Sequence, residues 1–219
     1  MKLSILAVAV LSAVLWLGCG DGANPGGGGG GGGGVPIEKW MKENLNIETA
    51  DSWCYGEDGK VFNNSGSGFV TLTPSQIQAN CDIYGRLYTW EAAKKACQSI
   101  GMRLPTRKEW GALVTAAGGE KWAGKKLKST SGWYNSEYTY VPDGNDPKGT
   151  DEFGFSALPG GYKAPSLEYY GAVGIMGYWW TATESDRDHA YSLTILYVDG
   201  VVDKDEDKAH GYSVRCVDN

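Results

Sequence analysis

Histidine is scarce in this sequence of 219 residues, which contains only His189 and His210. The two histidines do not have the spacing of metal ligands and no Cys-x-x-Cys pair occurs, so a zinc site is not expected. A Gly-x-Ser-x-Gly motif, which would present a serine nucleophile, is also absent. The sequence therefore offers little for metal-dependent or nucleophilic catalysis.

Basic residues are fewer than acidic ones. The sequence has 20 Lys and Arg against 26 Asp and Glu, which gives a formal net charge of −6 and an isoelectric point of about 5.0. A nucleic-acid-binding domain needs a basic face that replaces the counterions along the phosphates. We therefore expect no nucleic acid among the partners of this protein.

Long hydrophobic runs are lacking as well. The mostly apolar run at the N-terminus, residues 3–17, is too short to span a bilayer comfortably, and it stands between Lys2 and the pair Gly18 and Cys19. This order resembles the signal of bacterial lipoproteins, which predicts a signal peptide over residues 1–18 and acylation of Cys19. The alternative is a plain secretory signal cleaved nearby, with Cys19 as an odd thiol. Both alternatives predict export.

Glycine, in contrast, is abundant and unevenly placed. Nine of the 33 glycines form the run Gly26–Gly34, and no Gly-x-y period runs through the chain, which excludes a collagen-like protein. Residues 19–34 have nothing to bury and are expected to form a flexible tether with a reach of about 20 to 25 Å. Residues 35–219 are expected to form a single domain, which in the lipoprotein alternative is held through Cys19 at the outer membrane of a bacterial cell envelope.

Four cysteines remain in the expected domain: Cys54, Cys81, Cys97 and Cys216. An even number of cysteines in an exported domain predicts two disulfides. Counting leaves all three connectivities open.

Local patterns predict two helices followed by short strands. Residues 89–101 have a threonine N-cap and a glycine stop, and residues 106–117 begin with a capping box formed by Thr106 and Glu109. Alternating residues predict strands over 191–197 and 212–216, and residues 198–201 are typical of a hairpin turn.

Seven segments of the sequence have a recognisable order: Trp40–Asn46, Asp51–Tyr55, Tyr84–Trp90, Gly124–Ser129, Asp151–Tyr162, Gly177–Glu184 and Ser213–Val217. Together they extend over nearly all of residues 36–219. These segments resemble, in the same order, those of the Fibrobacter succinogenes major paralogous domain family.

That family is in turn similar to the C-type-lectin-like fold, in the branch that includes the formylglycine-generating enzymes. The resemblance implies an α+β domain of two helices packed on short, mostly antiparallel strands, rich in loops and with two disulfides. It also implies that Cys97 of the first helix pairs with Cys216 of the last strand, which leaves Cys54 with Cys81.

The resemblance to the enzymes concerns the fold rather than the activity. Residues 103–110 match their Arg-Leu-Pro-Thr-x-x-Glu-Trp motif, which reads as a helix cap followed by core residues. The enzymes use a reactive cysteine pair near the C-terminus, whereas residues 189–214 of this chain contain no cysteine. We therefore expect no catalytic residues and no catalytic cofactor.

Calcium is the one metal for which the sequence offers candidates. The acidic run 203–207 lacks the glycine and the glutamate of an EF-hand loop and is expected to be a solvated turn. A second oxygen-rich loop could hold a structural calcium ion through Asp143, Asn145, Asp146 and Asp151.

Aromatic side chains in glycine- and proline-flanked segments are the candidate ligand-binding residues. Rings flanked by amide and carboxylate groups suit stacking on sugars, although aromatics in such a domain can instead cover its core. The candidates are Trp133, Tyr134, Tyr138, Tyr140, Tyr169 and Tyr170.

The sequence thus predicts an exported, lipid-anchored protein that binds polysaccharide or another surface component of the cell envelope without catalysis. Two alternatives remain open. One is a degenerate or unrecognised enzyme of the formylglycine-generating-like fold, and the other is a structural envelope protein.

Overall fold

The computed structural model describes residues 36–62, 68–133, 148–165 and 169–219. These residues belong to one compact unit, Gly34–Asn219. The expected signal peptide (1–18) and tether (19–34), and with them Cys19, lie outside the described residues. Within the described ranges, no helix combines the length and the apolar character that crossing a bilayer requires.

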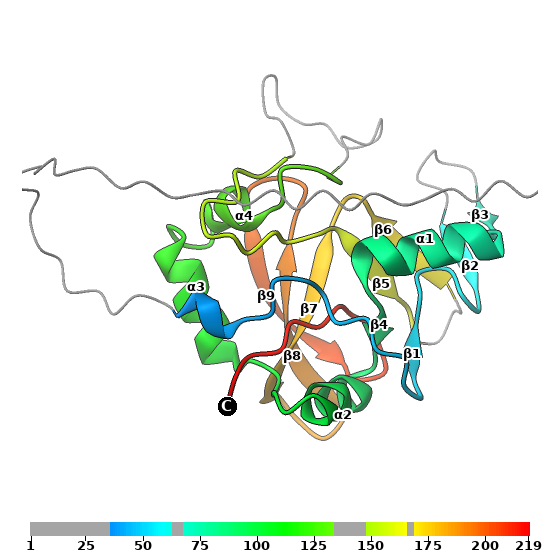
Figure 1. The fold of residues 1–219 in the computed structure, drawn as a ribbon, viewed down its shortest axis with the longest axis horizontal. Helices are drawn as coiled ribbons and strands as arrows, with labels where there is room; N and C mark the ends of the chain where they lie inside the picture. Colours follow the sequence, from blue (N-terminus) through cyan, green and yellow to red (C-terminus); the bar gives the residue numbers. More distant parts are fainter. Residues whose placement is uncertain (1–35, 63–67, 134–147, 166–168) are drawn as a thin grey trace, which may run out of the picture. The chain divides into compact units, whose positions relative to one another are not determined.

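The unit is a loop-rich fold of mixed α and β structure (Figure 1). A seven-stranded sheet has the order β3-β2-β6-β5-β7-β8-β9, while β1 and β4 form a separate two-stranded sheet. Most pairings are antiparallel, but β2 with β6 and β5 with β7 are parallel. The helices are α1 (Pro74–Tyr84), α2 (Trp90–Ser99), α3 (Arg107–Ala116), α4 (Ala123–Leu127) and the 3-10 turn η1 (Ile37–Lys39). The strands are β1 (Ser52–Trp53), β2 (Lys60–Phe62), β3 (Phe69–Val70), β4 (Leu87–Tyr88), β5 (Gly160–Lys163), β6 (Tyr169–Val173), β7 (Gly177–Glu184), β8 (His189–Ile195) and β9 (Val201–Asp207).

Buried side chains cover both faces of the strands β7 and β8. On one face, Trp179 and Leu193 pack in a cluster with Trp110 of α3. Successive residues of a strand point to opposite faces, so Trp180 lies on the other face, where it packs in a cluster with Trp90 of α2. The helices α3 and α2 therefore cover opposite faces of the same strands.

The two predicted helices are confirmed as α2 and α3, but the expectation of only two helices is wrong. Thr89 caps α2, and the capping box of Thr106 and Glu109 starts α3. Within the described residues two further helices, α1 and α4, are present. Helix α1 has no regular apolar stripe, and its clearest signal in the sequence is a second capping box, at Thr73 and Gln76.

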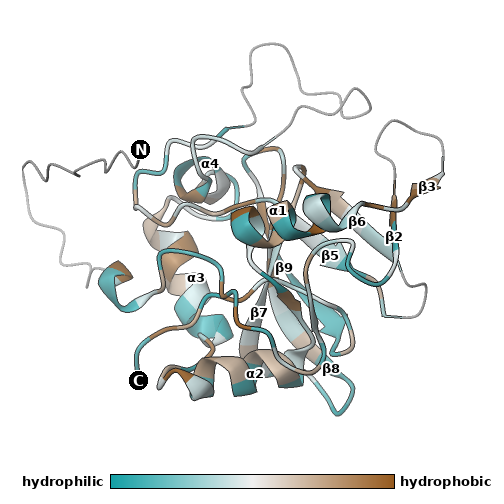
Figure 2. Ribbon diagram, turned by 45° about the vertical axis from the view of Figure 1, so that its right-hand side comes forward, coloured by the Kyte–Doolittle hydropathy of each residue, from teal (hydrophilic) through white to brown (hydrophobic). Residues whose placement is uncertain are grey.

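The predicted hairpin turn joins β8 to β9, where Ile195 pairs with Val201. The expectation that residues 203–207 form a solvated turn is wrong, because they continue β9 as the outermost strand of the sheet. Figure 2 shows this part of β9 as hydrophilic. Charged side chains on an edge strand discourage pairing with another chain, which explains how an acidic run can be a strand.

The C-terminal segment 211–217 is not the regular strand that its alternation predicts. It forms single bridges to five different partners, at Trp40, Tyr88, Arg103, Lys163 and Trp179. All seven of its residues are buried, not alternate ones. The segment passes through the interior instead of pairing along one neighbour.

Two disulfides close the fold, Cys54–Cys81 and Cys97–Cys216. They are the pairs that the family resemblance implies. The Cys97–Cys216 bond joins α2 to the C-terminal segment across 119 residues of sequence. Closing a loop of that length stabilises a fold by about 4 to 5 kcal/mol in the chain-entropy model.

A buried arginine holds the C-terminal segment from its other side. Arg215 is fully buried, and burial lowers its pKa to about 9, so it stays charged at neutral pH. Its guanidinium donates to the side-chain oxygen of Asn44 (2.8 Å) and to the carbonyl oxygens of Met41 (3.0 Å), Phe155 (2.8 Å) and Ser156 (3.0 Å). Arg215 therefore ties the C-terminal segment to the N-terminal segment and to the 151–156 loop.

We expect Arg215→Met to lower the free energy of unfolding by at least about 3 kcal/mol, because several buried oxygens lose a charged donor at once. Chemical denaturation with the disulfides intact measures this change. Arg187→Met, at the exposed turn between β7 and β8, is the matched control and should shift stability by at most about 0.5 kcal/mol. An effect of Arg215→Met as small as that of the control would contradict the proposed role of the cation.

The start of α3 predicts a dependence of stability on pH. Glu109 accepts hydrogen bonds from Arg103 (2.7 and 2.9 Å) and from the Thr106 amide (2.7 Å). These bonds, chiefly those from Arg103, lower the pKa of Glu109 to about 2. A carboxyl group whose pKa is lower in the folded state stabilises the fold above its ordinary pKa, and this contribution is lost as the pH falls from about 4.5 to about 2.

We therefore expect Glu109→Gln to be less stable than the unmodified protein at pH 7, by about 1 kcal/mol or less because the carboxylate is partly exposed. The difference should close as the pH falls toward 2. Denaturation curves between pH 7 and pH 2 test this, with Glu91→Gln as control because Glu91 is more exposed and pairs only with Lys94. A difference that is constant across the pH range would show that the ionised carboxylate is not the cause.

Candidate functional site

Two of the predicted ligand-binding aromatics lie in the interior. Trp133 is buried, and its indole N–H donates to Ser129 and to the carbonyl oxygen of Ala157. Tyr170 is fully buried and donates to Asp58 at 2.5 Å. Neither ring can stack on an external ligand, so assigning them to a binding surface was wrong. Three further candidates, Tyr134, Tyr138 and Tyr140, lie outside the described residues.

Tyr169, the remaining candidate, is partly exposed and belongs to a continuous series of rings that we call the aromatic row. Neighbouring ring centroids in the row lie 5.1 to 6.1 Å apart. In spatial order the row consists of Phe62, Phe69, Tyr169, Tyr162, Tyr178, Tyr212 and His210.

Strand alternation explains how the row forms. In β6, Tyr169 points to one face and Tyr170 to the buried one, and in β7 Tyr178 alternates with the buried Trp179. Tyr162 of β5 pairs with Gly171 of β6. A Cβ atom on Gly171 would lie 3.1 Å from the Tyr162 ring, so the glycine leaves room for that ring to lie across β6.

The row changes character along its length. At the β2–β3 end, Phe62 and Phe69 are 44% and 51% exposed. Tyr162, Tyr169 and Tyr178 are partly exposed, while Tyr212 is buried. The row therefore combines an open apolar end with a half-buried tyrosine centre.

The hydroxyls of Tyr162, Tyr178 and Tyr212 are neutral at physiological pH. Burial raises the pKa of Tyr178 to about 12, and burial also raises that of Tyr162 and Tyr212. The negative charge of Glu206 in β9 adds to the rise in the pKa of Tyr212. The row thus offers ring faces, hydroxyl groups and one carboxylate, which can stack on a ligand and hydrogen-bond to it.

Of the four calcium candidates, only Asp151 lies within the described residues. Asp143, Asn145 and Asp146 lie outside the described residues. Both carboxylate oxygens of Asp151 accept hydrogen bonds from Ser156, at 2.6 and 2.5 Å. Across the described ranges, no three His, Cys, Asp or Glu side chains are grouped so that they could hold a metal ion.

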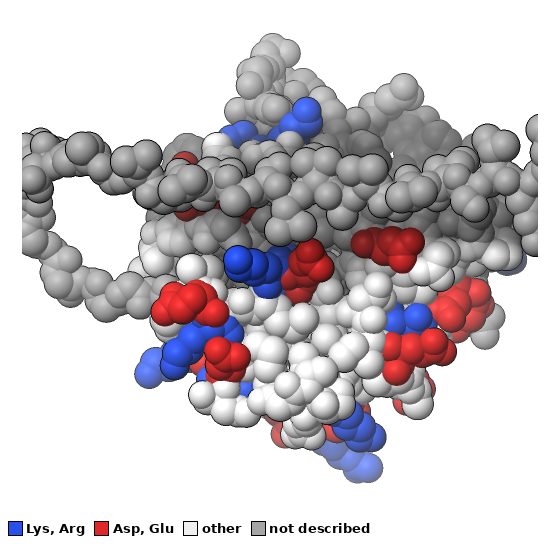
Figure 3. All heavy atoms as spheres, in the orientation of Figure 1, with Lys and Arg blue, Asp and Glu red and all other residues white. Residues whose placement is uncertain are grey.

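Charge on the molecular surface is mixed. On the face shown in Figure 3, basic side chains stand in separate small groups beside acidic ones, and uncharged surface lies between them. All four described cysteines are in disulfides, so none of them is a thiol nucleophile.

The sequence patterns predict only one member of the row, Tyr169, as a ligand-binding residue. The available signal was the alternation in β7, where Tyr178 and Trp180 flank Trp179, together with glycines beside Tyr162. That signal predicts a strand with two aromatic faces, but it does not predict which other strands lie beside it.

Comparison with known proteins finds no matching curated protein and no matching solved structure. The sequence does match the family model of the Fibrobacter succinogenes major domain over residues 37–218, which include every described helix and strand. The chain therefore belongs to the Fibrobacter succinogenes major domain family.

Proposed function

We propose that this domain is a non-catalytic binding protein of the bacterial cell envelope that recognises polysaccharide through the aromatic row. The single observation that carries the proposal is the partial exposure of several contacting rings on one face of the sheet. In the same proposal, the signal peptide and acylated Cys19 anchor the protein at the outer membrane, and the glycine tether lets the domain reach its ligand.

Sugars suit the chemistry of the row. A pyranose ring has apolar C–H faces and a rim of hydroxyl groups, so it gains from aromatic rings with polar edges. Tyr162 and Tyr169 supply both, and their hydroxyl oxygens lie 3.4 Å apart. A ligand can therefore displace a weak internal hydrogen bond and form stronger ones.

The orientation of the rings favours a single polysaccharide chain over a flat, crystalline surface. Tyr162 is inclined at 72° to both Tyr169 and Tyr178. A flat surface can stack only on rings that lie in one plane, whereas a flexible chain can follow rings that turn along the row. We therefore expect soluble glycans to bind better than crystalline ones.

The proposal includes a relationship to the C-type-lectin-like fold. The bond from Cys97 in α2 to Cys216 in the C-terminal segment supports it, because lectin-like domains join their first helix to their last strand in this way. The formylglycine-generating motif at residues 103–110 supports a common fold without common activity. Here it forms the cap and the first turn of α3.

A glycan array with the full-length protein tests the proposal, with and without a calcium chelator. We expect binding to neutral polysaccharides that survives the chelator, because the described residues of the row include no metal site. Absence of binding to every glycan would overturn the polysaccharide proposal, and loss of binding with the chelator would assign it to a calcium site elsewhere.

Substitutions in the row should weaken binding to whichever glycan the array identifies. We expect Tyr169→Ala and Phe69→Ala each to lower the affinity by about tenfold, as for an aromatic residue that contributes strongly to an interface. Trp122→Ala is the matched control, because Trp122 is 53% exposed and lies outside the row, at the start of α4. Affinity electrophoresis measures the change, and equal behaviour of row and control variants would count against the row as the binding surface.

A further inference from the structure

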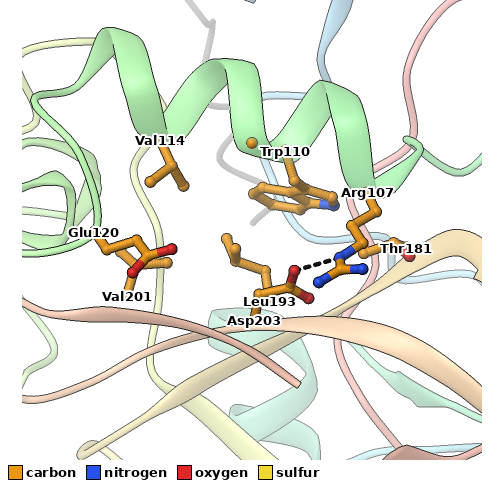
Figure 4. A pocket seen from close by; sticks show the side chains of 9 residues that line it. Arg107, Trp110, Val114, Glu120, Thr181, Leu193, Val201 and Asp203 are labelled. Atoms are coloured by element: carbon orange, nitrogen blue, oxygen red, sulfur yellow. Dashed lines mark hydrogen bonds and ion pairs between the residues drawn. The ribbon is translucent and has the colours of Figure 1, made fainter. Parts of the chain in front are cut away.

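A small cavity lies between α3 and the strands β7, β8 and β9 (Figure 4). Its volume is about 70 Å³. Leu193, which lines it, pairs with Trp179 and so lies on the face of the sheet opposite to Tyr178 of the aromatic row. Its apolar wall consists of Trp110, Val114, Leu193 and Val201, and its polar rim of Arg107, Glu120 and Asp203.

The cavity wall contains a hydrogen-bond donor without a partner. The Trp110 side chain is 1% exposed, and its Nε1 atom has no hydrogen-bond partner among the described residues. Buried donors are nearly always paired, and the indoles of four other buried tryptophans follow this rule. They are Trp90, Trp133, Trp179 and Trp180. Figure 4 shows the nitrogen edge of Trp110 turned toward the end of the cavity where Arg107 and Thr181 lie.

A glycine at the cavity is unexplained by the fold itself. Gly111 lies in the middle of α3, where glycine is less favourable than alanine. A Cβ atom at this position would meet no other atom within 4 Å, so packing does not require the glycine. Gly124 shows the contrast, because a Cβ atom there would lie 2.5 Å from the carbonyl oxygen of Asp199. An unhindered glycine beside a cavity permits close approach of a group from outside.

The volume limits what can enter. A cavity of about 150 Å³ holds benzene, so about 70 Å³ suits a group of three or four heavy atoms. The apolar wall and the unpaired Trp110 donor suit a ligand group that has an apolar part and one acceptor oxygen. An acetamido group has these features, since it consists of a methyl group, a carbonyl and an amide nitrogen.

We propose that this cavity binds the acetamido group of an N-acetylated ligand. The methyl group packs against Val114, Leu193 and Val201, and the carbonyl oxygen accepts a hydrogen bond from Trp110 Nε1. The rest of the ligand passes over Gly111, and the carboxylates of Asp203 and Glu120 at the rim are acceptors for the amide N–H.

The rim of the cavity is held in place by Arg107. Its Nε donates to Asp203, and its guanidinium lies 3.8 Å from the centre of the Tyr191 ring. Arg107 and Asp203 neutralise each other, while Glu120 adds a negative charge. A neutral acetamido group therefore suits the rim better than an acetate ion.

Two sources provide this chemistry, an N-acetylhexosamine and an Nε-acetyl-lysine side chain. The full-length protein, labelled with ¹⁵N at its tryptophan indoles, distinguishes them by NMR titration. The Trp110 signal is assigned by its loss in Trp110→Phe. We expect N-acetylglucosamine, but not glucosamine or glucose, to shift the Trp110 indole signal, with a dissociation constant in the millimolar range for so small an anchor.

The acetyl-lysine arm uses a short peptide with and without the acetyl group. A shift with the acetylated peptide and none with the sugar would assign the cavity to acetylated proteins. Shifts with neither ligand would overturn the proposal and leave water as the partner of Trp110.

Gly111→Ala separates a binding role from a structural one. We expect this substitution to raise the melting temperature by about 2 to 4 °C, because alanine is the better helix former, and to weaken binding of the acetylated ligand by at least about fivefold. Lys108→Ala, on the exposed side of α3, is the control and should leave binding unchanged. Unchanged binding in Gly111→Ala would refute the role of the glycine. The aromatic row contributes nothing to this site, so Tyr169→Ala should keep the response of Trp110 even if the proposed polysaccharide function fails.

Discussion

The buried guanidinium of Arg215 is the constraint on which the rest of this fold depends. A charge removed from water is tolerated only where the protein supplies its hydrogen bonds, and here the acceptors come from two parts of the chain, residues 41–44 and residues 155–156, both far in sequence from Arg215. Asn44 extends the network, because its side-chain oxygen also accepts from Trp179 and its amide donates to the carbonyl oxygen of Tyr84. One cation thus links the N-terminal segment, the main sheet and the end of α1.

The position of the C-terminal segment decides the shape of the aromatic row. Cys97–Cys216 and Arg215 fix the segment within the interior, and Tyr212 then lies against Tyr178 and Trp180. Because Gly211 bridges to Lys163 and Ser213 to Trp179, the segment also joins β5 to β7 beyond their single pair at Gly161 and Gly177. The rings of the row come from five strands and from residues 210 and 212, and the buried segment joins the two strands at the centre of the row.

Helices α2 and α3 could be predicted from the sequence because their signals are local, whereas the row could not. A capping box needs only four consecutive residues, and Thr106 with Glu109 is sufficient to place the start of α3. Tyr162 and Tyr178 meet because β5 and β7 are parallel neighbours, and no local pattern encodes that choice. The same limit explains why Trp133 and Tyr170 were wrongly predicted to bind ligand. The sequence around an aromatic residue near a turn is the same whether the residue faces the core or the solvent.

The acidic edge of the sheet restricts the ligands of both proposed sites. Strand β9 places Glu206 beside the aromatic row and Asp203 beside the cavity, on opposite faces of the same strand. A glycan rich in carboxylate or sulfate groups would meet like charge at either site, and the formal net charge of −6 would slow its approach. Neutral sugars meet no such penalty, and their hydroxyl and amide groups can donate to these carboxylates. The charges that protect β9 from pairing with another chain would therefore also favour uncharged ligands at the two proposed sites.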